Sequence, residues 1–239
     1  MPRFFLENIN TDKPEITGED AKHIGKSLRM RPGENITVCS CGRDYLCEIK
    51  NITPDKVELS ILSEKLCSAE PSVKITLFQA VPKQDKLEHI IQKSIELGVT
   101  EIVPVITMRC VSRPDKKDFS KKHERLSKIA AAAAKQSGRG IIPQVGDIIN
   151  FKQAVERMKE YDLSLMLYEE GGKRFSEISA EGCGNIALFV GSEGGIDESE
   201  AELAKQAGIT PIWLGERILR CETAPLTALS ILMYITKNI

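Results

Sequence analysis

The first 68 residues alternate short apolar runs with tight turns. Turn signals such as PGE, CGRD and TPDK separate three strand-like runs, which are NITVCS (35–40), YLCEIK (45–50) and KVELSIL (56–62). One longer amphipathic stretch at 18–30 predicts a helix that ends at Arg31-Pro32-Gly33. Several short strands within so short a segment favour a small β-barrel.

From residue 72 onward the hydrophobic pattern changes to strands that alternate with helices. Buried strands are predicted at 73–81, 101–107, 162–170, 185–191 and 211–215. Amphipathic helices are predicted at 83–99, 123–139 and 198–209, with a last one after Pro225. This alternation predicts a mostly parallel α/β sheet. The polar stretch around Pro71 indicates a linker, so we expect two domains, residues 1–70 and residues 71–239.

Composition is that of an ordinary globular protein, with 41% apolar and 28% charged residues. No apolar run reaches about 18 residues, and the start MPRFFLENINTDK lacks the apolar core of a signal peptide. We therefore expect a cytoplasmic protein without a membrane span. The seven cysteines include no CxxC pair and the three histidines lie far apart, so we expect reduced thiols and no metal site.

The net charge of −1 is unevenly distributed along the chain. Residues 104–145 hold ten Lys and Arg against three Asp and Glu, a net charge of +7. One basic segment in a near-neutral chain indicates a localised anion-binding face, suited to phosphate contacts. A solvated helix face would explain the same residues, and both interpretations stay open. The same holds for the smaller cluster Lys26, Arg29 and Arg31.

A glycine-rich turn follows the strand predicted at 185–191. The stretch LFVGSEGGIDESE (188–200) leads from strand to helix, which is the usual ligand position in an open α/β fold. It matches neither a P-loop nor GxGxxG, and Glu193, Asp197 and Glu198 would repel a phosphate there. A neutral or cationic ligand such as S-adenosylmethionine fits this turn. A tight strand–helix turn without a ligand is the alternative.

The stretch LGERILRCETAPLTALSIL (214–232) mixes charged and apolar residues after a second glycine-ended strand. Two such loops at one sheet edge would form a single pocket, in which Ile218 and Leu219 cradle a flat adenine. Arg220 and Glu222 would then face the reacting group. The alternative is a solvated loop with a salt bridge between Glu216 and Arg220.

Two of these stretches, FVGSEGG (189–195) and LGERILRCETAPLTAL (214–229), resemble the late motifs of SPOUT-class RNA methyltransferases. Further matches indicate the RsmE family, which methylates N3 of a uridine in small-subunit (16S) ribosomal RNA. They are MPRFF at the start, HIGKSLRMRPGE (23–34), QAVPKQDKLEHIIQKSIELGVTEIVPV (79–105) and AAAAKQSGR (131–139). The resemblance covers nearly the whole chain. Cys221 departs from it, because the family usually has threonine there.

The resemblance implies a PUA-like β-barrel that helps to hold RNA, followed by a SPOUT α/β domain with a trefoil knot within residues 185–230. It also implies a homodimer with the last helix near the interface. S-adenosylmethionine would be bound by Leu167, Tyr168, Glu169, Val190, Gly191, Ser192, Glu193, Gly194, Leu214, Gly215, Ile218, Leu219, Arg220, Thr223 and Ala224. The expected RNA-binding residues are Arg3, Lys26, Arg29, Arg31, Lys83, Lys86, Arg109, Arg113, Lys121, Lys122, Arg125, Gln136 and Arg139.

The implied reaction is methyl transfer from S-adenosylmethionine to uridine N3, in free 16S RNA or in the small subunit. Arg220 would stabilise charge on the uracil carbonyls, and Glu222 would act as the base or orient Arg220. Since N3 lies on the Watson–Crick edge, the uridine must be unpaired or flipped out. Two alternatives remain open, a SPOUT methyltransferase acting on another RNA such as transfer RNA, and a non-catalytic RNA-binding protein.

Overall fold

The computed structural model describes residues 1–239, with the exception of the side chain of Lys116. The chain forms two compact units. The N-terminal unit comprises Met1–Glu70 together with Ala134–Ile142, and the C-terminal unit comprises Pro71–Ala133 and Pro143–Ile239. Residues 134–142 therefore pack with the N-terminal unit, although the sequence pattern continues through them as part of the second domain.

A five-stranded sheet forms the N-terminal unit, in the order β1-β3-β4-β5-β2. Its strands are β1 (Arg3–Phe5), β2 (Glu15–Thr17), β3 (Asn35–Ser40), β4 (Arg43–Ile52) and β5 (Lys56–Leu66). The β1 strand runs parallel to β3, and the other pairings are antiparallel. Two register shifts between β4 and β5 let these long strands bend around the core, which includes Phe4, Ile16, Ile24, Ile36 and Ile49.

The helix predicted at 18–30 is shorter in the structure and changes type along its length. The α-helix α1 (Gly18–Lys22) continues directly into a π-helical segment, η1 (His23–Ser27). Arg29 then adopts a left-handed backbone conformation with φ of 53°. Only Ala21 and Ile24 are buried in these two segments, so little apolar surface supports a longer helix.

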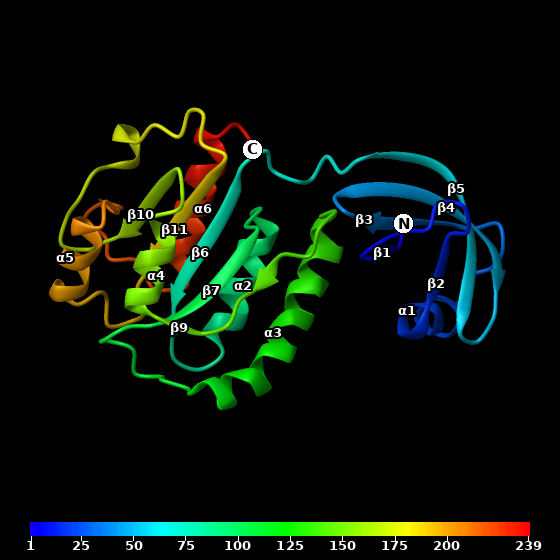
Figure 1. Cartoon of the computed structure of the whole chain (residues 1–239), viewed down its shortest axis with the longest axis horizontal. Coiled ribbons are helices and arrows are strands. Elements are labelled where there is room, and N and C mark those ends of the chain that lie inside the picture. The colour runs from blue at the N-terminus through cyan, green and yellow to red at the C-terminus, as the bar shows by residue number, and fades with distance from the viewer. The chain divides into compact units, whose positions relative to one another are not determined.

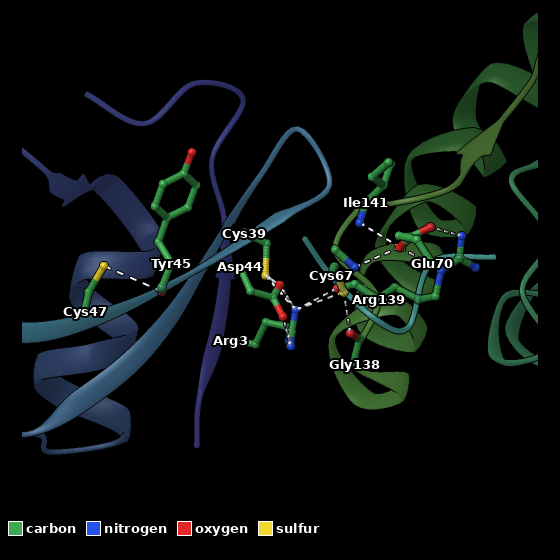
Figure 2. Close-up of polar contacts among 11 residues, drawn as sticks. Arg3, Cys39, Asp44, Tyr45, Cys47, Cys67, Glu70, Gly138, Arg139 and Ile141 are labelled. Carbon is green, nitrogen blue, oxygen red and sulfur yellow. Dashed lines mark hydrogen bonds and ion pairs between the residues drawn. The ribbon is translucent and has the colours of Figure 1, made fainter. Parts of the chain in front are cut away.

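Two ion pairs stabilise the N-terminal unit around the end of α3 (Lys116–Ser137) and the residues after it (Figure 2). The Arg3 guanidinium binds both oxygens of Asp44, at 2.6 and 3.0 Å, and donates to the Arg139 carbonyl oxygen at 3.1 Å. The Glu70 carboxylate accepts hydrogen bonds from the Arg139 guanidinium at 2.7 and 2.9 Å. It also accepts the next two backbone N–H groups, at 2.8 and 3.1 Å. These contacts join β1, β4, residue 70 and residues 138–141 within one unit.

The C-terminal unit is built on a seven-stranded sheet with the order β12-β10-β11-β6-β7-β8, in which β9 also pairs with β7 (Figure 1). Its strands are β6 (Lys74–Ala80), β7 (Glu101–Ile106), β8 (Gln144–Val145), β9 (Ile149–Asn150), β10 (Leu163–Leu167), β11 (Asn185–Val190) and β12 (Thr210–Ile212). Every pairing is parallel, as predicted from the alternation of strands and helices. The central strands β6 and β11 are almost continuously buried, as expected where helices cover both faces.

The helices that connect these strands are α2 (Lys86–Glu96), α3, α4 (Phe151–Met158), α5 (Glu198–Gln206) and α6 (Thr223–Ile235). The α3 helix starts before its predicted beginning at 123, because the Asp115 carboxylate accepts the Asp118 backbone N–H at 2.7 Å and caps the extra turns. Gly98 ends α2 with φ of 97°, and a Cβ there would lie 2.8 Å from Met233 Cε. This glycine therefore permits α6 to pack closely against the end of α2.

The parallel sheet determines where a ligand site can form. The carboxyl ends of β10, β11 and β12 meet at one edge, since these three strands are neighbours and run in the same direction. The loops at 168–172, 191–197 and 213–222 therefore lie together, in the position where open α/β sheets bind ligands. Among the described residues, no helix is long and apolar enough to cross a membrane.

Candidate functional site

A cavity of about 710 Å³ opens at this edge of the sheet. Its volume lies within the range of small-molecule sites, about 300–1,000 Å³. Three loops and the first residue of α2 form its walls. The lining residues are Lys86, Leu167, Tyr168, Glu169, Val190, Gly191, Ser192, Glu193, Gly194, Gly195, Ile212, Trp213, Leu214, Gly215, Glu216, Arg217, Ile218, Leu219, Arg220, Cys221 and Ala224.

The glycines of the 191–197 loop leave bare backbone on the cavity wall. A Cβ on Gly195 would lie 1.9 Å from Glu169 Oε1, and this residue also has a left-handed φ of 70°. A Cβ on Gly194 would lie 2.9 Å from the Arg109 carbonyl oxygen. Side chains at these positions would collide with neighbouring loops, so glycine is needed to bring the loops together.

Lys86 lies between two carboxylates at the cavity wall. Its Nζ atom is 3.2 Å from Glu193 Oε1 and 3.1 Å from Glu222 Oε2. These hydrogen bonds raise the pKa of Lys86, so the ammonium stays protonated. Burial alone would raise the pKa values of Glu193 and Glu222, but hydrogen bonds and the charge of Lys86 outweigh burial and lower both. The cluster therefore holds two carboxylate anions and one ammonium cation.

Cys221 belongs to the same cluster, which gives this departure from the family pattern a structural role. The side chain is 7% exposed, and its thiol donates to Glu222 Oε2 at a distance of 3.2 Å. Burial, this hydrogen bond and the nearby carboxylates raise the pKa of the Cys221 thiol to about 12. The sulfur therefore remains a protonated hydrogen-bond donor, the same function that a threonine hydroxyl would serve.

The Arg220 side chain makes no hydrogen bond or ion pair within the described part of the chain, and the same holds for its neighbour Arg217, which also lines the cavity. The Arg220 side chain is exposed and lines the cavity. The salt bridge between Glu216 and Arg220, considered above as an alternative, does not form. The Arg220 carbonyl oxygen accepts the backbone N–H groups of Thr223 and Ala224 at 2.8 and 2.9 Å, where α6 begins.

The structure brings together nearly all the predicted cofactor-binding residues. Thr223 is the exception and is exposed at the start of α6. Glu222, predicted to face the reacting group, does not line the cavity and instead pairs with Lys86. The lining residues that are not among the predicted cofactor-binding residues are Lys86, Gly195, Ile212, Trp213, Glu216, Arg217 and Cys221. The motif loops themselves offered a signal for all of these except Lys86, which comes from a distant helix.

Two of the predicted RNA-binding arginines have structural roles, which corrects those predictions. Arg139 is 2% exposed and paired with Glu70, while Arg3 is held in a bidentate pair by Asp44. A charge enclosed in this way is not available to an RNA phosphate. The pattern of basic residues could not reveal this, because Asp44 lies 41 positions from Arg3 and Glu70 lies 69 positions from Arg139.

Other predicted RNA-binding residues lie in different settings. Lys86 lines the cavity, Arg109 pairs with Asp197 at 3.5 Å, and the Arg113 guanidinium donates to the carbonyl oxygens of its own loop. Arg125 pairs with Glu88 at 2.8 Å but keeps 65% of its side chain exposed. Lys122 is half-buried, whereas Gln136 is exposed. The other exposed positions are Lys26, Arg29, Arg31, Lys83 and Lys121.

Both the parallel sheet with its edge cavity and the family comparisons place the chain among RNA methyltransferases. A model of the RNA methyltransferase domain matches residues 69–233, and a model of the RNA methyltransferase PUA domain matches residues 16–62. The chain is 39% identical over 252 residues to ribosomal RNA small subunit methyltransferase E of Bacillus subtilis (strain 168), covering 99% of this chain and 98% of that protein. It belongs to the ribosomal RNA small subunit methyltransferase E family.

Two similar solved structures carry a cofactor. The first is ribosomal RNA small subunit methyltransferase E from Neisseria gonorrhoeae bound to S-adenosylmethionine, with a TM-score of 0.88, 34% identity and 98% of each chain covered. The second is a methyltransferase from Legionella pneumophila in complex with the same cofactor, with a TM-score of 0.84 and 33% identity. That match covers 97% of this chain and 96% of the other.

Proposed function

We propose that this chain transfers a methyl group from S-adenosylmethionine to N3 of a uridine in 16S ribosomal RNA of the small subunit. The observation that carries the proposal is the cavity at the carboxyl ends of β10, β11 and β12, lined by both family motifs. Membership of the methyltransferase E family supports ribosomal RNA as the substrate. Methyl transfer to N3 follows from the sequence resemblance and the chemistry of the cavity.

The residues of the cavity fit S-adenosylmethionine. Gly194 and Gly195 let the neighbouring loops close together around the cavity. Apolar side chains such as Leu214 and Leu219 suit a flat adenine, while the carboxylates of Glu169 and Glu193 suit a cationic ligand and oppose a phosphate. When bound, S-adenosylmethionine supplies a methyl group on a positively charged sulfur.

The protein's main tasks are then to position the uridine and to favour loss of its N3 proton. Arg220 is an exposed cation of the cavity, as is Arg217, and would donate to a uracil carbonyl oxygen, where negative charge gathers once N3 is deprotonated. The target base must leave its stack to reach the cavity. Glu222 acts indirectly in this proposal, because its carboxylate is bound by Lys86 and Cys221 rather than by Arg220.

The remaining parts of the proposal concern assembly and location. A homodimer is supported by two large apolar side chains that are exposed in the single chain, Ile218 at the cavity and Tyr234 on α6, at 87% and 72%. The seven free cysteines suit the reducing cytoplasm. The trefoil knot within residues 185–230 remains a prediction. Sedimentation analysis that finds only monomers at micromolar concentration would remove the dimer from this proposal.

The activity can be tested on small ribosomal subunits from a bacterial strain that lacks its own methyltransferase E. The purified chain and S-adenosylmethionine carrying an isotopically labelled methyl group are added, and the RNA is digested and mapped by mass spectrometry. We expect label in 3-methyluridine at a single position of 16S RNA. Label in transfer RNA alone, or on another atom of the base, would contradict the proposal. Absence of calorimetric binding to S-adenosylhomocysteine would favour a non-catalytic RNA-binding protein.

A further inference from the structure

Lys86 is a cavity cation that lies outside the two ligand-loop motifs at 189–195 and 214–229 and that the proposed reaction has not yet used. It is the first residue of α2, far from both ligand loops in the sequence. A lysine is disfavoured at a helix N-terminus, because the helix dipole places positive charge there. Its ion pairs with Glu193 and Glu222 offset this disadvantage, so its position is held by residues from two other loops.

The three N–H donors of the Lys86 ammonium are unequally used. Two are engaged by Glu193 and Glu222 at 3.2 and 3.1 Å. The third donor has only the Cys221 sulfur, at 3.9 Å, which is a weak acceptor. Lys86 is 31% exposed in its side chain and lines the cavity, so a ligand oxygen can replace this contact.

Lys86 contacts the residue that directly follows Arg220 in the chain. That residue is Cys221, whose sulfur contacts the Lys86 ammonium. The cavity wall therefore presents cations from different elements, Arg217 and Arg220 from the loop after β12 and Lys86 from α2. Because its pKa is raised, Lys86 stays charged and cannot serve as a proton acceptor near neutral pH.

The chemistry of uracil gives two such cations complementary roles. When the N3–H bond breaks and the proton leaves to water, the electron pair remains on the ring and its charge spreads to O2 and O4. These two oxygens lie on either side of N3. A cation at each oxygen lowers the pKa of the bound uridine and holds N3 open between them.

We propose that the Lys86 ammonium binds one uracil carbonyl oxygen while Arg220 binds the other, and that the two cations together stabilise the uridine anion. This inference rests on the proposed function. It makes Lys86 a catalytic residue that contacts the substrate, with Glu193 and Glu222 as positioning residues. The N3–carbon bond then forms as the carbon–sulfur bond breaks, and Lys86 takes no other part in this step.

The test exploits 5-fluorouridine, whose electron-withdrawing fluorine makes N3–H more acidic. Small subunits are reconstituted with 16S RNA transcribed with either uridine or 5-fluorouridine. Single-turnover methylation is followed against pH for the wild-type chain, Lys86→Met, Lys86→Gln and Lys86→Arg. Lys93→Met is the matched control, since Lys93 lies on the same helix in an ion pair with Glu96. Binding of S-adenosylhomocysteine and thermal unfolding are measured for each variant.

On uridine, we expect Lys86→Met to slow methylation by about 100-fold, the typical loss for one oxyanion donor. The rising limb of the rate against pH should move to higher pH, and the loss should shrink by about tenfold or more on 5-fluorouridine. Lys86→Gln keeps a donor for the two carboxylates without the charge and should behave in the same way. Lys86→Arg should restore most of the rate, and Lys93→Met should match the wild type.

Equal losses on both substrates, without movement of the pH limb, would assign Lys86 a purely structural role and overturn the inference. A wild-type rate in Lys86→Gln would do the same. Should Lys86→Met fail to fold, the comparison of the two substrates with Lys86→Gln decides the question. A wild-type chain that methylates no uridine would instead overturn the proposed function itself, whatever the variants do.

Discussion

Two clusters of charged side chains in this protein contrast sharply. In the N-terminal unit, the pairs Arg3–Asp44 and Glu70–Arg139 match each cation with one anion in bidentate geometry. At the cavity of the C-terminal unit, one ammonium serves two carboxylates, and Arg220 has no partner in the described part of the chain. We call the first cluster balanced, because each cation in it pairs with one anion. We call the second unbalanced, because two carboxylates share one ammonium there while an arginine nearby is left without a counter-ion among the described residues.

The contrast separates structural charges from charges that are available for chemistry. A buried ion pair is tolerated only when hydrogen bonds satisfy it fully, as those of Glu70 are. An exposed arginine beside a cavity contributes little to folding, so its charge is available to a ligand. Basic residues alone do not make this distinction, since Arg3, Arg139 and Arg220 all look alike in the sequence.

The largest expected effect comes from breaking the balanced cluster. Glu70→Gln should lower the free energy of unfolding by about 3 kcal/mol, because the Arg139 guanidinium stays buried without its counter-charge. The figure is at the low end for a buried pair, since the Glu70 side chain keeps 16% exposure. Urea denaturation measures it. Glu64→Gln is the control, because its pair with Arg43 is exposed, and it should cost less than about 1 kcal/mol. If both variants lowered the free energy of unfolding equally, the buried pair would be no more important for stability than the exposed one.

A smaller effect, and one of a different kind, is expected at the unbalanced cluster. Arg220→Ala should slow methylation by about 100-fold, or roughly 2.7 kcal/mol, because a donor to the uracil oxygen is lost. The free energy of unfolding should stay within about 0.5 kcal/mol and binding of S-adenosylhomocysteine within about threefold, since the side chain has no partner among the described residues. Arg43→Ala serves as the control. A normal methylation rate in Arg220→Ala would show that this cation has no catalytic role.

The pH dependence of stability should also follow the balanced cluster. Burial raises the pKa of Glu70, but the hydrogen bonds and charge of Arg139 outweigh it, so the folded pKa lies below the unfolded value. Its stabilising contribution is therefore present above about pH 4.3 and lost as pH falls through the folded pKa. Urea titrations between pH 7 and pH 3 should show a smaller loss of the free energy of unfolding on acidification in Glu70→Gln than in the wild type. Parallel curves would contradict this.

The smallest effect is expected on the exposed face of α3. Lys121→Glu, Lys122→Glu and Arg125→Glu together should weaken RNA binding and reduce the slope of log affinity against log salt by at most about 2–3. The slope should fall by less than the amount expected for three lost phosphate contacts, because Arg125 already pairs with Glu88. Filter binding at several salt concentrations measures the slope. With Lys50→Glu as control, an unchanged slope in the triple variant would exclude this face from the RNA footprint.

Much of the fold could be predicted, because it depends on local patterns of burial. Alternation of apolar runs predicted the parallel sheet, and Gly98 marks the end of α2 in both pattern and structure. The two-residue strands β8 and β9 were missed, since segments so short carry no periodicity. The π-helical turn η1 was missed for a similar reason. The early start of α3 at Lys116 depends on capping by Asp115, which lies outside the amphipathic pattern.

The sequence by itself determined the ligand loops of this protein, because glycines, carboxylates and apolar residues at 189–195 and 214–229 lie next to one another in the chain. Only the tertiary structure decided which charges are paired. Lys86 meets Glu222 across 136 positions, and Arg139 meets Glu70 across 69. Ion pairing depends on distances of a few ångströms, which chain spacing does not report once strands and helices have packed. The same basic residue type therefore stabilises the N-terminal unit at Arg139 and lines the cavity, without a partner, at Arg220.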